Sequence, residues 1–243
     1  MGEETVFVPS VELNSLHKMP RIGFGTWLLK PENVGNIIKN AIKCGYRHID
    51  CAFIYGNQRE IGKALNEVFE ERIVKLFGSL FNSLPMGYKE GEIYFQKWII
   101  KFCCQIIRPA VLQTEIHVYF QQDELFKFCK VNGINVVASC PLASSNENPF
   151  RKSDYPSVFN DPVIKKIADE LGQTNAQIAL HYLIQKGLSV IPKSSNEERM
   201  SENIKIIKFL LNDEQMEKMS KLNTGKRIIH LELSCHSPLY PWK

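Results

Sequence analysis

The stretch "PENVGNIIKNAIKCGYRHIDCA", residues 31–52, predicts a helix that leads directly into a buried strand. Apolar residues recur at the spacing of one helical face as far as Ile42, and Gly45 follows where such a helix should end. "YRHIDCA" then alternates as a strand does, with His48 and Asp50 on the same face. The stretch therefore indicates one unit of an alternating helix–strand fold.

The alternation continues on both sides of this unit. Further strands are expected in "RIGFGTW" (21–27), "AVLQTEIH" (110–117), "INVVASCPL" (134–142) and "LSVIP" (188–192). Further helices are expected in "REIGKALNEVF" (59–69), "QDELFKFCKVNG" (122–133), "DPVIKKIADELG" (161–172), "TNAQIALHYLIQKG" (174–187) and from "SNEERMSENI" (195–204) onward. Strands separated by helices imply a parallel sheet in an α/β fold. Because no strand is followed by a GxGxxG helix, a (β/α) barrel is favoured over a doubly wound sheet.

Residues 70–109 do not continue the pattern. They contain one plausible strand, "LFGSLFNSL" (76–84), and "FQKWIIKFCCQII" (95–107) is apolar on all sides, as either a buried helix or a strand would be. We therefore expect a single domain over residues 1–243 with an irregular, shortened segment at about 70–108. The barrel should be incomplete.

Bulk composition excludes several classes of function. The 243 residues carry a net charge of +4, with the basic residues scattered, so no nucleic-acid partner is expected. Seven cysteines without a CxxC pair suit reduced thiols, and no His or Cys pair has zinc spacing. The amino terminus is acidic and lacks a signal-peptide core, and no apolar run is long enough to cross a membrane. These features predict a cytoplasmic protein without a metal.

In parallel sheets of this kind, functional residues collect at the carboxyl ends of the strands. "IPKSSNEERMSENI" (191–204) delivers Lys193 and Ser194 to such an end and then opens a helix near Asn196, with Arg199 in its first turn. Cations at a helix start suit a phosphate monoester such as the 2′-phosphate of NADP. The alternative is a solvated helix cap, which the neighbouring Glu197 and Glu198 favour because they oppose an anion.

Asp50 and Tyr55 form the second candidate constellation. A buried carboxylate needs a partner, and an ammonium beside it would lower the pKa of Tyr55 towards that of a useful acid. The alternative is a rim tyrosine with its hydroxyl in water and an aspartate that caps a turn. Gln113 is either a cofactor contact or a satisfied interior amide, and His48 is expected to bond a carbonyl in the core.

Motifs along the chain resemble the aldo-keto reductase family. They are "PRIGFGTW", "GYRHIDCAFIYGNQREIGKAL", "RPAVLQTEIH", "GINVVASCPLA", "DPVIKKIADELGQTNAQIAL" and "VIPKSSNEERMSENI", and they occur in the family's order. The resemblance implies a TIM-type (β/α)8 barrel and NADPH-dependent reduction of aldehydes and ketones. It also implies a monomer that acts on a small carbonyl substrate.

The resemblance assigns roles to particular residues. Tyr55 would protonate the carbonyl oxygen and Asp50 would orient a catalytic lysine. Trp27 would line the substrate pocket. Cofactor contacts would come from Thr26 and Gln113 at the nicotinamide, Cys140 and Leu142 at the pyrophosphate, Lys193, Ser194, Asn196 and Arg199 at the 2′-phosphate, and Glu202 and Asn203 at the adenine.

The chain departs from the family pattern at the nicotinamide end of this site. The third strand, which carries the catalytic lysine, is absent after Lys75, and the fifth strand with its Ser–Asn pair is also missing. Ser83 and Leu84 stand where the family has its catalytic histidine and the following tryptophan. Ser139 replaces the aromatic residue that stacks on the nicotinamide. The catalytic set is therefore incomplete.

These losses leave three hypotheses open. The first is an impaired reductase, because loss of general-acid assistance costs about 10²–10⁴-fold in rate. A substitute ammonium would have to come from Lys89, Lys97 or Lys101. The second is an inactive chain that at most binds NADP(H). The third is an interaction protein, because strands two and six would have unpaired edges that allow self-association.

Overall fold

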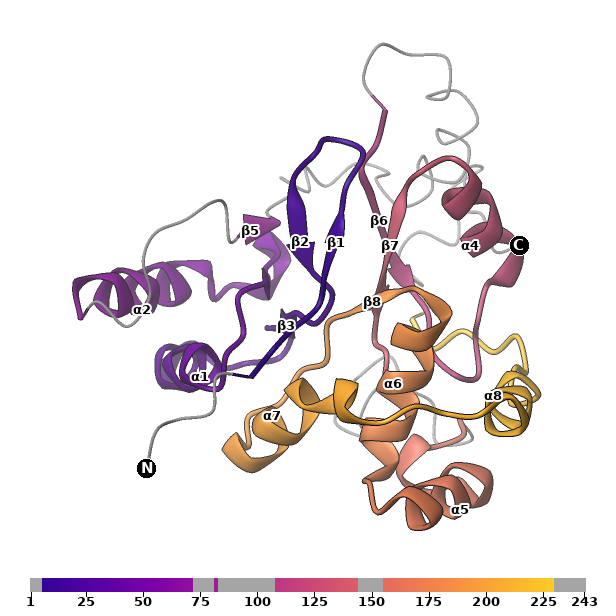
Figure 1. Cartoon of the computed structure of the whole chain (residues 1–243). Helices are drawn as coiled ribbons and strands as arrows, with labels where there is room; N and C mark the ends of the chain where they lie inside the picture. Colours follow the sequence, from indigo (N-terminus) through magenta and orange to yellow (C-terminus); the bar gives the residue numbers. More distant parts are fainter. Residues whose placement is uncertain (1–5, 72–80, 83–107, 144–154, 230–243) are drawn as a thin grey trace, which may run out of the picture.

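The computed structural model describes residues 6–71, 81–82, 108–143 and 155–229 (Figure 1). Its strands are β1 (Ser10–Glu12), β2 (Lys18–Pro20), β3 (Phe24–Gly25), β4 (Ile49–Asp50), β5 (Phe81–Asn82), β6 (Val111–Glu115), β7 (Asn135–Ser139) and β8 (Ser189–Val190). Its α-helices are α1 (Pro31–Lys43), α2 (Gln58–Glu70), α4 (Asp123–Val131), α5 (Pro162–Leu171), α6 (Asn175–Lys186), α7 (Glu197–Ile204) and α8 (Asp213–Ser220). The 3₁₀ turns are η1 (Phe53–Tyr55), η2 (Val158–Asn160) and η3 (Ile206–Lys208).

Parallel strands form the centre of the α/β fold. One sheet has the order β3–β4–β5 and the other the order β6–β7–β8. A parallel bridge between Ile22 and Val190 joins them, and the backbone N–H of Gly23 donates to the Val190 carbonyl at 2.8 Å. The strands therefore follow one another as β5–β4–β3–β8–β7–β6. Within the described residues this curved sheet does not close into a barrel.

The edge of β4 is covered, which corrects one expectation. Phe81 and Asn82 pair in parallel with Ile49 and Asp50, so β5 occupies the place where a third barrel strand would lie. The prediction of an unpaired edge on the second strand was wrong. The reason is that the next strand-forming segment, within the expected "LFGSLFNSL", satisfies the exposed backbone groups of β4. At the other end, no described strand pairs with the outer edge of β6.

The helices form where local signals predicted them. Asp161 caps α5 by accepting from the backbone N–H groups of Val163 at 2.9 Å and Ile164 at 3.2 Å. Gly172 ends the helix in the left-handed conformation, with φ of 62°. α6 opens with the expected capping box between Thr174 and Gln177. Because each signal lies within one turn of its helix end, the sequence predicts these helices correctly.

Two strands and one α-helix were not expected from the sequence. β1 and β2 form an antiparallel hairpin, with Val11 opposite Met19. α8 begins with a capping box between Asn212 and Gln215, so a local signal for it was present. Figure 1 shows α6 beside β8, with α5, α7 and α8 around it, while α1 and α2 lie beside β3–β5.

One hydrophobic cluster extends from Ile22 to Ile228 and includes residues from both sheets and most helices. His48 is buried and its Nδ1 lies 3.1 Å from the Pro20 carbonyl oxygen, as expected for a core histidine. No helix in the described part of the chain is long and apolar enough to cross a membrane. Across the same ranges no cluster of His, Cys, Asp and Glu side chains could hold a metal.

Several expectations concern residues outside the described ranges. Most of the segment at about 70–108 lies outside them. Ser83 and Leu84, at the positions of the missing catalytic residues, also lie outside the described ranges. So do the candidate replacement lysines Lys89, Lys97 and Lys101.

Candidate active site

Two strands and one 3₁₀ turn bring the first candidate constellation together. Asp50 is the last residue of β4 and only 5% exposed. The Nε2 of Gln113, from β6, donates to Asp50 Oδ1 at 3.0 Å. The hydroxyl of Tyr55, from η1, donates to Asp50 Oδ2 at 3.4 Å, which is a long contact. Asp50 is therefore the centre of a small polar network inside the sheet.

The polar residues of the site were expected at the carboxyl ends of strands, and Gln113 is the exception. Thr26 directly follows β3, Asp50 ends β4 and Cys140 directly follows β7. Gln113 is instead the central residue of β6, because that strand continues to Glu115. Its side chain reaches Asp50 from within the sheet.

The loop after β3 is fixed by two buried side chains. The Thr26 hydroxyl donates to the Asp50 backbone carbonyl at 2.7 Å, so it ties β3 to β4. Asn57 Nδ2 donates to the carbonyls of Thr26 and Leu29, both at 3.0 Å. Sequence reasoning did not single out Asn57. Its position before α2 is typical of a helix cap, but its side chain turns to this loop instead.

Tyr55 packs beside Trp27. Their ring centroids are 4.9 Å apart with an interplanar angle of 54°. η1 ends at Gly56, whose φ of 66° is the left-handed conformation that glycine adopts at low cost. The neighbouring side chains of Phe53 and Ile54 are 73% and 51% exposed. Aromatic and apolar side chains therefore lie beside Tyr55 at the mouth of the site.

The electrostatics of this network disfavour proton donation by Tyr55. Burial raises the pKa of Asp50, and the hydrogen bond from Gln113, the nearby His48 and the bond from Tyr55 offset it only in part. Burial, followed by the charge of Asp50, raises the pKa of Tyr55 well above that of a free phenol. Among the described residues, no ammonium or guanidinium forms an ion pair with Asp50.

The second constellation lies between β8 and α7. Ser194 is buried, and its hydroxyl accepts from the Asn196 N–H at 3.1 Å. Asn196 in turn caps α7, since its side chain accepts from the Arg199 N–H at 2.9 Å. No ion pair of Lys193 or Arg199 occurs within the described ranges, although Glu197 and Glu198 lie in the same helical turn. Both a helix cap and two available cations are therefore present.

The segment after β8 packs closely against the carboxyl end of β3. A Cβ on Gly25 would meet the Ile191 carbonyl oxygen at 2.9 Å and Lys193 Cβ at 3.5 Å. Only glycine at this position lets the chain after β8 approach so closely. Lys193 is thereby placed near the same strand ends as Thr26 and Asp50.

The remaining predicted cofactor residues fall at two places. Cys140 has a φ of 52° and its carbonyl accepts from the Ala143 N–H at 2.9 Å, so the chain turns sharply after β7. Leu142 is half-buried in this turn. Glu202 and Asn203 lie in the last turn of α7, where Asn203 is 4% exposed.

A second buried carboxylate was not recognised as a site from the sequence. Glu115 Oε1 accepts from the Ile228 N–H at 2.6 Å and lies 3.1 Å from His117 Nε2, and Oε2 accepts from the Ile229 N–H at 3.0 Å. Burial alone would raise the pKa of Glu115, but these hydrogen bonds together hold it below its ordinary value. The group fastens the end of β6 to the chain after α8.

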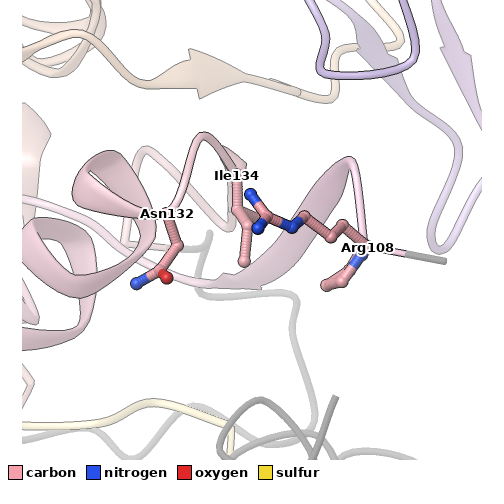
Figure 2. Close-up of a pocket in the computed structure, with 4 residues that line it drawn as sticks. Arg108, Asn132 and Ile134 are labelled. Carbon is pink, nitrogen blue, oxygen red and sulfur yellow. The ribbon is translucent and has the colours of Figure 1, made fainter. Parts of the chain in front are cut away.

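A pocket lies at the opposite end of the sheet. Figure 2 shows Arg108 extending along Ile134, with Asn132 beside them. These residues precede β6 and β7, so the pocket is at the amino ends of the strands. It is separate from the network around Asp50.

Comparison with known proteins shows which family the chain belongs to. The sequence model of the aldo/keto reductase family matches residues 21–80 and 98–224. Aldo-keto reductase family 1 member A1 of Mus musculus is 30% identical over 318 residues, with 96% of this chain and 98% of the relative covered. Aldo-keto reductase family 4 member C11 of Arabidopsis thaliana is 30% identical over 302 residues, with 96% and 94% covered. The NADP-dependent D-sorbitol-6-phosphate dehydrogenase of Malus domestica is 30% identical over 287 residues, with 86% and 92% covered.

The lengths of these alignments show that this chain is shorter than its relatives and that the missing positions are internal. The alignment with the mouse protein spans 318 residues against 243 here, so at least 75 of its positions have no counterpart in this chain. The relative is nevertheless covered almost from end to end, so the missing positions are internal. The relatives are reductases and a dehydrogenase, which are oxidoreductases. This chain belongs to the aldo/keto reductase family, as an internally shortened member.

Proposed function

We propose that the chain is an NADPH-dependent reductase of aldehydes and ketones whose proton-donating group is impaired. Carbonyl reduction is the general activity of its family, and one relative is named as NADP-dependent. The observation that carries the proposal is the Asp50–Tyr55–Gln113 network, which places a phenol at the mouth of the sheet beside a carboxylate that has no cationic partner among the described residues. The substrate would be a small carbonyl compound bound beside Trp27.

The proposal extends to the fold as a whole. Residues 1–243 would form a single, incomplete TIM-type barrel that lacks the third and fifth strands of the family, with β5 in the place of the third, and that is shortened at about 70–108. The continuous strand order from β5 to β6 supports this interpretation. The outer edge of β6 would be the site of any self-association, because a parallel strand edge offers unpaired backbone groups.

The donor set at α7 fits the phosphate end of an NADP cofactor. Lys193 and Arg199 supply charge, and the N–H groups at the start of α7 supply hydrogen-bond donors. Lys193, Ser194, Asn196 and Arg199 would hold the 2′-phosphate, Glu202 and Asn203 the adenine, and Cys140 and Leu142 the pyrophosphate. When bound, the cofactor would supply the hydride.

The nicotinamide end fits less well. Thr26 uses its hydroxyl on the Asp50 carbonyl, and Gln113 uses its amide on the Asp50 carboxylate. Gln113 has one amide hydrogen committed to Asp50, so only its amide oxygen and its second N–H would remain for a nicotinamide carboxamide. Tyr55 would have to turn its hydroxyl from Asp50 to a substrate oxygen, and its raised pKa opposes the transfer of that proton.

The same observation favours a second candidate function. If Tyr55 remains bound to Asp50, the chain would bind NADP(H) through α7 and β7 without turning over. Binding and turnover are separable, because the phosphate residues and Tyr55 come from different parts of the chain. This candidate predicts affinity for the cofactor and no chemistry.

A two-stage assay tests the proposal. Quenching of the fluorescence of Trp27, Trp98 and Trp242 by NADPH should be saturable. Oxidation of NADPH in the presence of an aromatic aldehyde should then be slow and should disappear in Tyr55→Phe. Quenching without oxidation would select the inactive binder. Absence of both would contradict the assignment of a cofactor site.

A further inference from the structure

Asp50 has a partner that its assigned role does not predict. The family resemblance implies a lysine beside this carboxylate, yet the closest side-chain donor among the described residues is Gln113, at 3.0 Å. β6 holds Gln113 firmly, because each of its residues from Val111 to Glu115 pairs in register with β7. The contact spans the interior between two strands that are 63 positions apart in sequence.

The direction of this hydrogen bond is fixed by chemistry. An ionised carboxylate only accepts hydrogen bonds, so the amide nitrogen of Gln113 must face Asp50 and its oxygen must face away. An amide supplies a donor as a lysine would, but it brings no charge. It therefore satisfies one carboxylate oxygen and leaves the negative charge in place.

The second carboxylate oxygen then determines where the Tyr55 hydroxyl points. Oδ2 accepts from Tyr55 at 3.4 Å, and no other donor to it occurs in the described part of the chain. With an ammonium present, charge neutralisation would free the phenol for another acceptor. With an amide present, the charge continues to attract the phenol proton.

We propose that Gln113 is a positioning residue that replaces the missing lysine as the donor to Asp50 and thereby keeps the Tyr55 hydroxyl bound to that carboxylate. This inference rests on the proposed role of Tyr55 as proton donor. It states that the identity of residue 113 sets the proton affinity of the phenol. Burial and the charge of Asp50 both raise the pKa of Tyr55, as such an arrangement requires.

The substitution Gln113→Lys tests this directly. Lysine is one atom longer than glutamine, so its ammonium can reach Asp50 from the same strand position. An opposite charge at this distance lowers the pKa of a neighbouring acid by about 1–3 units. The apparent pKa of the Tyr55 phenol should therefore fall by at least about one unit. The change in phenolate absorbance reports it, after subtraction of the same titration in the Tyr55→Phe background.

The matched control is Gln113→Met, which has similar length but neither charge nor donor. It should not lower the pKa of the phenol. A Gln113→Lys protein whose phenol titrates as in the wild type would overturn the proposal. A similar fall in both variants would also overturn it, because loss of the amide alone would then be responsible.

The methionine variant also provides a test if Gln113→Lys does not fold. Removal of the donor should destabilise the protein increasingly as pH rises through the pKa of Asp50, because the amide stabilises the ionised carboxylate more strongly than the neutral carboxyl group. The increase should vanish in an Asp50→Asn background. A loss of stability that is equal at all pH values would show that Gln113 is only a packing residue. Neither measurement requires cofactor or substrate, so a failure of the proposed reductase activity is distinguishable from a failure of this inference.

Discussion

Asp50→Asn should stabilise the protein at neutral pH. Replacement of a buried ionisable residue usually lowers stability, but Asp50 carries a charge without a cation among the described residues. Asparagine keeps the volume and can still accept the hydrogen bond from Gln113. Its amide can donate to the Tyr55 hydroxyl, which can accept as well as donate.

The magnitude follows from the contacts of Asp50. Burying an ionised carboxylate costs several kcal/mol even after relaxation. A hydrogen bond to a charged group returns about 1.5–3 kcal/mol, and Asp50 has one well-formed bond and one long contact. The charge should therefore destabilise the fold by about 1–3 kcal/mol at neutral pH. Asp50→Asn should raise the melting temperature by about 2–4 °C for each kcal/mol.

The pH dependence gives the sharper signature. Burial raises the pKa of Asp50 in the folded state, so its stabilising contribution is present below the unfolded value of about 4 and is lost as pH rises through the folded value. The advantage of Asp50→Asn should therefore be small near pH 4 and full near pH 8. Urea unfolding at a series of pH values measures it.

Glu115→Gln is the matched control, because Glu115 is also a buried carboxylate but its pKa is lowered, whereas that of Asp50 is raised. Its hydrogen bonds hold its pKa below the ordinary value, so its stabilisation is present above that value and is lost as pH falls through the folded one. Glu115→Gln should cost about 1–3 kcal/mol at neutral pH, since one amide oxygen cannot accept from all the donors around it. If Asp50→Asn destabilises the protein as Glu115→Gln does, Asp50 has a cationic partner and the reasoning fails.

Three further predictions concern other parts of the molecule. Arg199→Ala should weaken binding of NADPH at least about tenfold more than binding of NADH, because a charge-assisted bond to the extra phosphate is lost; equal losses in fluorescence titrations would contradict the assignment of that phosphate. Asp161→Ala should lower the free energy of unfolding by about 1 kcal/mol through loss of the α5 cap, whereas Asp161→Asn should retain most of it. Gly25→Ala should lower the melting temperature, because its Cβ would meet the Ile191 carbonyl oxygen at 2.9 Å, and an unchanged transition would show that the segment after β8 can move aside.

The sequence predicts elements of this fold better than it predicts contacts. α5 and α6 follow from caps and glycines that lie within a turn of each helix end. The pairing of β5 with β4 could not be predicted in this way, because it depends on which strand edge is free after the chain has been shortened. The short β1–β2 hairpin lacks a strong turn signal, so its strands did not stand out from a loop.

The same distinction holds for the candidate site. Asp50, Tyr55 and Gln113 were each selected from their residue type and expected strand position. Their hydrogen bonds to one another depend on the order β4–β3–β8–β7–β6, which no local pattern specifies. Glu115 was overlooked for a related reason, since its two backbone donors come from residues more than 100 positions later.

The two halves of the site therefore differ in how they respond to an internal deletion. Lys193, Ser194, Asn196 and Arg199 lie within one strand-to-helix turn, and their geometry is fixed by the cap of α7 and by contact with Gly25. The network around Asp50 needs side chains from strands on both sides of the shortened segment. If the strand that supplies a cation in the family is lost, as proposed, the buried carboxylate takes the nearest donor among the described residues, and β6 places an amide there. The amide gives a carboxylate oxygen its hydrogen bond but does not neutralise the charge. Such an arrangement preserves the fold more readily than it preserves proton donation by Tyr55.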